Sequence, residues 1–223
     1  LNCSLKYRYQ YVEKRPAERV SIALPFGSAV HAALEYFYTS AAKGEIVPIA
    51  LFVERFATCL ELDLEKKDVP VIYKKDAPDQ KAAFELGKSM LEAFHESVAP
   101  VVEDMPEIVA VELPLTARLY TADGKPTDFM LAGILDLVLR DKNGEILVVD
   151  NKTAAKPMAQ KTADEDNQMT AYSYLLAANK YVFPTAPVRC QFQVLRKLKK
   201  PKVEYVETVR TAEQRKRFSK IAN

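Results

Sequence analysis

Tryptophan is absent from this chain of 223 residues, and cysteine and histidine are scarce, with three and two residues. The cysteines, Cys3, Cys59 and Cys190, stand far apart and form no CxxC pair. Isolated cysteines in odd number argue against a disulfide framework and against a self-contained zinc site. They are typical of a reducing setting, so we expect a cytoplasmic protein.

Long hydrophobic runs and an excess of one charge are also lacking. Apolar runs such as residues 146–149 are far too short to span a bilayer, so we expect no membrane segment. The 32 basic and 30 acidic side chains leave a net charge of +2, which favours no class of partner. With 48% apolar and 28% charged residues, the composition is that of an ordinary globular protein. We expect residues 1–223 to form a single domain, and we do not fix where this domain begins and ends.

Positive charge gathers in residues 196–220, which hold ten Lys or Arg against three Glu and include the run RKLKKPK. Such a segment is able to follow a phosphate backbone. It is equally typical of a solvated stretch that favours solubility. Composition alone leaves both interpretations open.

Hydrophobic periodicity predicts helices first and a sheet afterwards. Three early helices are expected at residues 26–42, 49–66 and 79–99, and Asp79 is the expected N-cap of the third. Runs rich in Val, Ile and Leu then predict strands at residues 109–120, 129–140, 145–150, 188–195 and 203–209. The second and third of these runs are apolar at nearly every position, so we expect both faces to be covered. Two more helices are expected at residues 166–180 and 211–221.

This order of elements predicts an α/β fold, with a mixed β-sheet core flanked by helices. The helical residues 45–105 are expected to form an inserted lobe between the first helix and the sheet.

The tripeptide Asp150-Asn151-Lys152 follows a strongly apolar run. Side chains alternate along a strand, so Asp150 and Lys152 share one face while Asn151 points to the other. A carboxylate held there suits a hard divalent cation, and a nearby lysine is able to stabilise charge that develops on a phosphate. Alone the tripeptide is weak evidence, because charged residues at strand ends are mostly solvated ion pairs.

Asp136 interrupts an otherwise apolar strand, LAGILDLVL, where an unpaired charge is expensive. If residues 142–144 form a three-residue hairpin loop with Gly144 in the left-handed conformation, counting back along both strands sets Asp136 opposite Asp150. A two-residue loop would instead place the two carboxylates on opposite faces.

His31 and Glu35 are four residues apart in the first expected helix, and Gln168 and Tyr172 repeat this spacing in a later one. Residues at i and i+4 project from the same side of a helix. Taken singly, a helical histidine is more often a packing or surface residue, and a glutamine beside a core aromatic is also ordinary. The two pairs gain meaning only together with the carboxylates.

Together these pieces resemble the RecB-like branch of the PD-(D/E)xK nucleases. That pattern has GxxxHxxxE on an early helix, GxxD on a strand, (D/E)xK on the next strand and QxxxY on a later helix. The sequence contains all four in this order, at Gly27–His31–Glu35, Gly133–Asp136, Asp150–Lys152 and Gln168–Tyr172. Its opening segment CSLKYRYQYV is also similar to the start of the family.

The resemblance implies a restriction-endonuclease-like fold and a metal-dependent deoxyribonuclease. The enzyme would be an exonuclease or an end-processing nuclease that hydrolyses phosphodiester bonds in DNA repair, recombination or phage-related DNA metabolism. DNA would be its partner, together with a helicase or recombination protein.

The resemblance also implies a role for each residue of the motifs. His31, Asp136 and Asp150 would be ligands of Mg²⁺ or Mn²⁺, and the backbone carbonyl of Asn151 would add another. Lys152 would orient the attacking water and stabilise the pentacovalent phosphate. Asp136, Asp150 and Lys152 would thus form the catalytic set.

Four further residues would support that set. Glu35 and Glu112 would lie behind the metal ligands, with Glu112 reaching a metal through water, although Glu112 is equally typical of a surface strand residue. Gln168 and Tyr172 would position the strand that bears the lysine, and the nucleic-acid backbone.

Some relatives hold an iron–sulfur cluster with one N-terminal cysteine and three clustered C-terminal ones. Cys3 matches the first, but Cys59 and Cys190 do not match the others. We therefore expect no iron–sulfur site.

Two other hypotheses remain. The chain is alternatively a non-catalytic nucleic-acid-binding subunit that retains the nuclease fold, or a metal-binding α/β enzyme with a different substrate. The complete set of ligands and lysine disfavours the former, and the basic segment weakly disfavours the latter.

Overall fold

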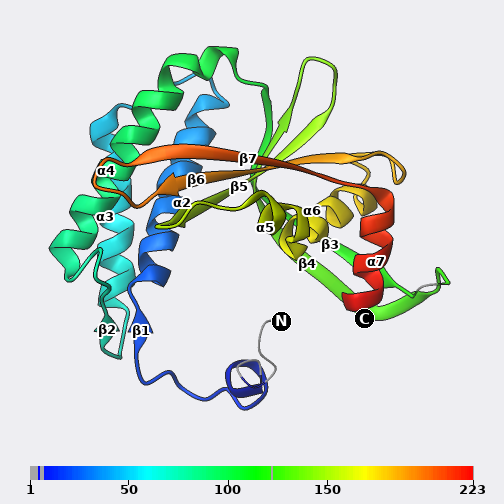
Figure 1. Cartoon of the computed structure of the whole chain (residues 1–223), viewed down its shortest axis with the longest axis horizontal. Coiled ribbons are helices and arrows are strands. Elements are labelled where there is room, and N and C mark those ends of the chain that lie inside the picture. Colours follow the sequence, from blue (N-terminus) through cyan, green and yellow to red (C-terminus); the bar gives the residue numbers. More distant parts are fainter. Residues whose placement is uncertain (1–4, 6–7, 122, 223) are drawn as a thin grey trace.

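The chain forms a central sheet with helices on both sides. A computed structural model describes residues 5, 8–121 and 123–222 (Figure 1). Its strands are β1 (Val20–Ser21), β2 (Val71–Ile72), β3 (Glu107–Tyr120), β4 (Pro126–Arg140), β5 (Ile146–Ala154), β6 (Val188–Arg196) and β7 (Lys202–Arg210). Its α-helices are α2 (Ala23–Ala41), α3 (Ile49–Glu65), α4 (Gln80–Val98), α5 (Gln160–Glu165), α6 (Asn167–Ala178) and α7 (Ala212–Ala222). Short π- and 3₁₀-helical segments are η1 (Arg8–Val12) and η2 (Ala99–Asp104).

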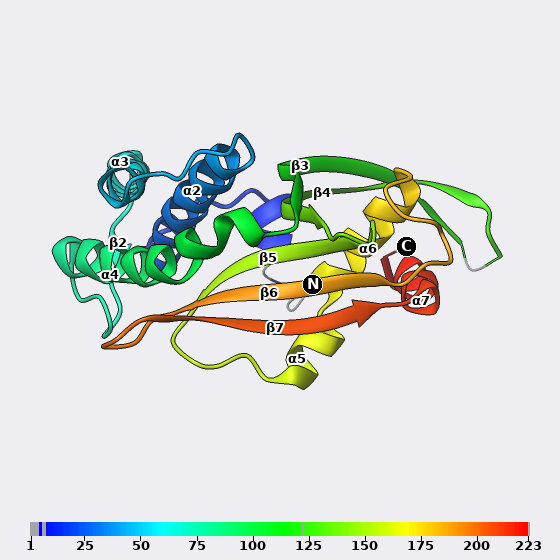
Figure 2. The same cartoon turned by 90° about the horizontal axis from the view of Figure 1, so that it is seen from above.

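Strands β3 to β7 form one sheet in the order β3-β4-β5-β6-β7 (Figure 2). Neighbouring strands are antiparallel except β5 and β6, which are parallel because α5 and α6 carry the chain back between them. The short strands β1 and β2 pair in parallel outside this sheet. A mixed sheet flanked by helices confirms the predicted α/β fold.

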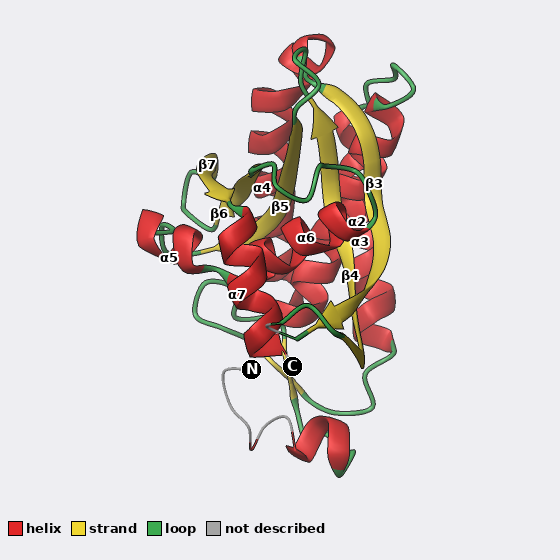
Figure 3. Ribbon diagram, turned by 90° about the vertical axis from the view of Figure 1, so that its right-hand side faces the viewer, coloured by secondary structure: helices red, strands yellow, loops and turns green. Residues whose placement is uncertain are grey.

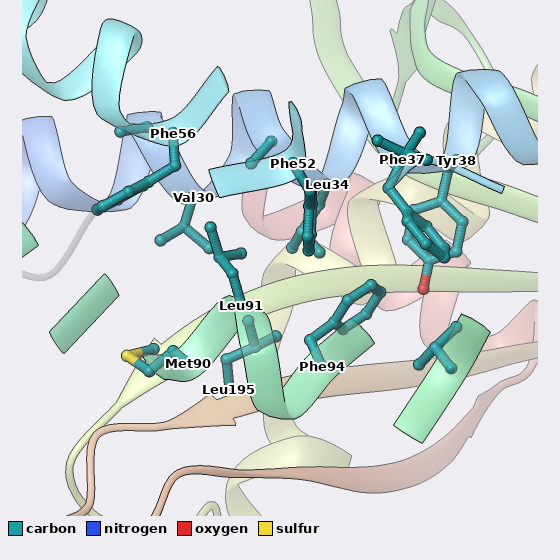
Figure 4. Packing of buried hydrophobic residues seen from close by; sticks show 14 of the residues in the cluster. Val30, Leu34, Phe37, Tyr38, Phe52, Phe56, Met90, Leu91, Phe94 and Leu195 are labelled. Atoms are coloured by element: carbon teal, nitrogen blue, oxygen red, sulfur yellow. The ribbon is translucent and has the colours of Figure 1, made fainter. Parts of the chain in front are cut away.

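Two groups of helices cover the sheet. Figure 1 shows α2, α3 and α4 at one end of it and α5, α6 and α7 at the other, and Figure 3 looks at the molecule from the side of α6 and α7. Aromatic rings from α2, α3 and α4, such as Phe37, Phe52 and Phe94, pack together above Leu195 of β6 (Figure 4). Each fully buried ring contributes on the order of 1.5–3 kcal/mol. This cluster therefore anchors α2, the helix that carries His31.

The hairpin between β4 and β5 has the predicted register. Asp141 donates its backbone N–H to the carbonyl of Glu145, and the N–H of Gly144 donates to the backbone carbonyl of Asp141. Gly144 has φ +82°, the left-handed conformation that a three-residue loop requires. The prediction of an odd loop with a left-handed glycine is confirmed.

The expectation that the whole second strand is covered on both faces is wrong. Pairing between β4 and β5 begins at Leu137, so the earlier part of β4 pairs with β3 alone. On that two-stranded extension Phe129, Met130 and Ile134 are each more than half exposed. β5 is buried throughout residues 146–151, as expected.

Several element ends also differ from expectation. α2 begins at Ala23, because Pro25 is tolerated in the first turn of a helix, where its missing N–H is not needed. β5 continues beyond Lys152 to Ala154. Asp79 caps α4 as predicted, with its carboxylate accepting the N–H of Ala82 at 2.7 Å. No helix among the described residues is both long and apolar enough to cross a membrane.

Candidate functional site

The alternation of side chains between the two faces of the sheet is interrupted at Glu112 in β3 and at Asp136 in β4. On β4, Leu135 packs with the cluster around α6, whereas Leu137 packs with the cluster around α2, α3 and α4. Residues two apart in a regular strand share a face, so the alternation is broken between them. Glu112 opposite this break has φ +48°, a left-handed conformation that costs a non-glycine residue roughly 1–2 kcal/mol. Such strain, held in place by the fold, is typical of functional sites.

Three carboxylates lie in a row across adjacent strands at this break. The strand pairs on either side of Glu112 set it opposite Asp136, and the β4–β5 register extended by one residue sets Asp136 opposite Asp150. Asp136 Oδ2 accepts the backbone N–H of Asn151 at 2.7 Å, which joins the two strands where their regular pairing ends. Burial raises the pKa of Asp150 to about 6; the Lys152 ammonium opposes this effect and the Asp136 carboxylate adds to it.

α2 brings His31 to this row. His31 Nδ1 lies 3.4 Å from Asp136 Oδ2, and ligand atoms of His31, Glu112 and Asp136 all lie within 4.8 Å of one another. Burial, and then the charge of Asp136, raise the pKa of Glu112 above its ordinary range, with His31 acting in the opposite sense. A cleft of about 550 Å³ is lined by His31, by Glu112 and by Glu35, which lies one turn after His31 on α2. Glu35 also raises the pKa of Glu112, so its charge reaches the group.

The donor set fits a hard divalent cation. Carboxylate oxygens and an imidazole nitrogen are ligands that such ions accept, and a cation would offset the repulsion among the carboxylates. Asp150 Oδ2 is buried and pairs with the Lys152 ammonium at 2.7 Å. A carboxylate oxygen carries two lone pairs, so an oxygen with this one partner has room in its bonding for an ion. Asp150 nevertheless lies outside the close group formed by the ligand atoms of His31, Glu112 and Asp136.

Lys152 and Asp150 are held by Gln168. Lys152 Nζ donates to Gln168 Oε1 at 2.9 Å, and Gln168 Nε2 donates to Asp150 Oδ1 at 2.9 Å and to the Tyr172 hydroxyl at 2.7 Å. Asp166 caps α6, so the first turn of that helix delivers Gln168 to the strand. Burial raises the pKa of Tyr172 further above neutral, so its hydroxyl is a stable protonated partner for Gln168. The i, i+4 pair on α6 thus lies against the lysine-bearing strand.

Gly133, which precedes Asp136 in its motif, permits this close approach of α6. A Cβ at Gly133 would meet the Leu175 side chain at 2.9 Å and the Tyr172 ring at 3.5 Å. The glycine is therefore needed for packing and not for a special backbone angle.

Asn151 points to the opposite face of β5, as its position in the strand predicts. Its side-chain oxygen accepts from Gln193 Nε2 at 2.8 Å, and the Tyr38 hydroxyl donates to Gln193 Oε1 at 2.9 Å. This buried polar chain ties β5 and β6 to α2 and was not predicted. Its signal in the sequence is Gln193, which stands between the apolar Phe192 and Val194 of β6.

Cys59 and Cys190 are not among the residues that form this site. Cys59 is on α3, Cys190 is buried in β6, and both are free thiols. Burial raises the pKa of Cys190 to about 12. Cys3, which resembles the first cysteine of the iron–sulfur relatives, lies outside the described residues.

The chain matches one protein family over its whole length. The family model of the PD-(D/E)XK nuclease superfamily matches residues 1–223. A solved structure named "Putative exonuclease", from Eubacterium rectale, is 12% identical with a TM-score of 0.45, over 98% of this chain and 82% of that one. The structure of SSO0001 is 11% identical with a TM-score of 0.30, over 98% of this chain and 84% of that one. No curated protein sequence matches the chain.

Proposed function

The chain belongs to the PD-(D/E)XK nuclease superfamily, and we propose that it is a metal-dependent deoxyribonuclease that hydrolyses phosphodiester bonds. The observation that carries the proposal is the row of Glu112, Asp136 and Asp150, with His31 facing it and Lys152 beside it. A mutually repelling group of carboxylates, two of them buried, costs stability, so a chain without a cation to bind has little reason to keep it.

Mg²⁺ or Mn²⁺ is the ion we propose. His31, Asp136 and Asp150 would hold it with the backbone carbonyl of Asn151, and Glu112 would join them because its carboxylate lies in the same close group. When bound, the ion would neutralise charge on the phosphate and lower the pKa of water.

Lys152 supplies fixed positive charge beside this group. Its ammonium is held between Asp150 Oδ2 and Gln168 Oε1, so it needs no rearrangement when negative charge builds up on the phosphate. We assign it the catalytic role of stabilising that charge and orienting the attacking water. Gln168 and Tyr172 are positioning residues, because they hold the lysine and Asp150 in place.

The finer parts of the proposal rest on the motif pattern. We propose an exonuclease or end-processing enzyme of DNA repair, recombination or phage-related DNA metabolism, acting in the cytoplasm beside a helicase or recombination protein. We also propose that residues 1–223 are one nuclease domain in which residues 45–105 form a helical insertion.

The test is digestion of linear and circular DNA with Mg²⁺ or Mn²⁺. We expect the parent protein to degrade linear DNA and spare closed circles, Asp150→Ala to be inactive, and Glu145→Ala to match the parent. Glu145 is a matched control, because it is an exposed carboxylate in the hairpin loop that directly precedes β5. A parent protein that binds DNA but cuts none with either metal would contradict the proposal and favour a non-catalytic subunit.

A further inference from the structure

A second cleft adjoins the candidate site at the first turn of α2. It has a volume of about 510 Å³ and is lined by Ala23, Lys74, Lys75, Asp76, Thr153, Ala155 and Lys197. Ala23 also lines the cleft that contains His31 and Glu112, so the two hollows meet at this residue. Thr153 directly follows Lys152 on β5. A linear polymer that lies in one hollow therefore has a path into the other.

Four separate segments build this second cleft, and backbone hydrogen bonds hold them in place. Residues 74–77 form a tight turn closed by two backbone hydrogen bonds between Lys74 and Ala77, at 3.2 and 3.0 Å. The pairing of β1 with β2, extended by a bond from Ile22 N–H to the carbonyl of Ile72, ties the segment before this turn to the start of α2. Lys197 is fixed by its backbone N–H, which bonds to the carbonyl of Ala154 at 2.9 Å. Figure 2 shows the segment after β2 and the connection between β6 and β7 at the same end of the molecule.

The charge of the cleft is unbalanced. Three lysines face it against one carboxylate, Asp76, and none of the described acidic groups comes within 4 Å of any of these ammonium groups. The Lys197 ammonium lies 4.1 Å above the ring of Phe26 in the first turn of α2 and is half-buried. Burial lowers its pKa, with Asp76 opposing this effect and Lys74 adding to it. That turn of α2 contains no acidic residue, so the positive end of the helix dipole adds to the potential.

The basic run of the sequence is divided by the fold. Arg196 is buried and bound to Glu204, Lys202 also pairs with Glu204, and Lys199 and Lys200 are exposed. Lys197 is the one residue of this run that lines the cleft. The other two lysines of the cleft, Lys74 and Lys75, come from a segment distant in sequence. The charge that matters at this place is thus assembled by the fold from residues more than a hundred positions apart.

We propose that this cleft, defined by Lys74, Lys75 and Lys197, binds the backbone phosphates of the nucleic-acid strand that flank the phosphate being cut. The proposal rests on the proposed nuclease function and names where its substrate lies. An unbalanced group of ammonium ions, of which Lys197 is half-buried, fits phosphate oxygens, and its continuity with the carboxylate site fits a polymer and not a single small anion.

The test is equilibrium binding of a short fluorescent DNA oligonucleotide in EDTA, so that no cleavage occurs, at several salt concentrations. Lys74→Gln/Lys75→Gln/Lys197→Gln should weaken binding roughly tenfold or more and lower the slope of log K against log salt by about two to three. The matched control, Lys66→Gln/Lys199→Gln/Lys200→Gln, removes the same charge from exposed lysines that do not line the cleft, and it should change neither value. The double variant at 74 and 75 and the single variant at 197 are measured separately, with melting curves, in case the triple variant fails to fold.

Two further arms separate the sources of failure. Hydrolysis of bis-p-nitrophenyl phosphate, which has no flanking phosphate, should be unchanged by the cleft variant. A parent protein that hydrolyses neither this ester nor DNA refutes the nuclease proposal. In that case the binding measurement in EDTA still tests the cleft. Calorimetric titration with inorganic phosphate tests for a small-anion site. Lysine-dependent phosphate binding without a change in DNA affinity, or equal losses in the cleft and control variants, would overturn the inference.

Discussion

Replacing Asp150 with asparagine should stabilise the metal-free protein at neutral pH. Burial raises the pKa of this carboxyl from its ordinary value of 3.8 to about 6. A pKa difference of about two corresponds to about 3 kcal/mol between the protonated and ionised forms. The folded chain therefore carries a cost of that order whenever Asp150 is ionised, and an amide of the same shape removes it.

The sign of the pH dependence follows from the raised pKa. The folded state binds the proton more tightly than the unfolded state, so the protonated carboxyl contributes stability below about pH 4 that is lost as the pH rises through about 6. Asp150→Asn does not titrate. Its advantage over the parent should thus be greatest near about pH 8, and should disappear toward about pH 4.

The assay is urea unfolding of both proteins in EDTA across this pH range, beside melting curves. A gain of about 3 kcal/mol would raise the melting temperature by about 6–12 °C for a chain of this length. Adding Mn²⁺ should reverse the order, because the parent gains binding energy that the variant lacks. An asparagine variant that is no more stable than the parent at about pH 8 in EDTA, or whose advantage grows on acidification, would refute the reasoning.

Lys152→Ala is expected to lower the rate of DNA cleavage about 10²–10³-fold while leaving Mn²⁺ binding, measured by calorimetry, nearly unchanged; cleavage at the parent rate would refute the assigned role. Gln168→Leu removes three hydrogen bonds at similar size, so kcat should fall with little change in KM, and an unchanged kcat would show that Gln168 does not position the lysine. Gly87→Ala should destabilise the protein by about 1–3 kcal/mol in urea, because its Cβ would lie 2.1 Å from the Phe56 ring. Gly27→Ala, which meets nothing within 4 Å, should preserve or raise stability by about 0.5–1 kcal/mol, and equal losses at both glycines would contradict this packing.

Local signals in the sequence predict the hairpin that aligns two of the carboxylates. The turn chemistry of Asn143-Gly144 determines the loop length, and the loop length determines which residues of β4 and β5 face each other. Asp136 stands out because a charge in an apolar strand demands a partner. These features depend on neighbours in sequence, which is why they are predictable.

Other parts of the site depend on contacts distant in sequence. Nothing about a glutamate indicates that Glu112 adopts a left-handed backbone, and the change of face that accompanies it arises where β4 leaves β5 and pairs with β3 alone. The polar chain from Tyr38 through Gln193 to Asn151 joins three elements far apart along the chain. The β1–β2 pair that places Lys74 is only two residues long in each strand, too short to leave a hydrophobic pattern.

The central claim is that one divalent cation binds where α2 meets the row of carboxylates. Crystals of the parent protein grown with Mn²⁺, measured for anomalous scattering from manganese, test it most directly. We expect a manganese peak about 2.0–2.6 Å from the ligand atoms of His31, Asp136 and Asp150. Manganese bound only elsewhere on the molecule, with His31 and the carboxylates left without an ion at saturating Mn²⁺, would contradict it.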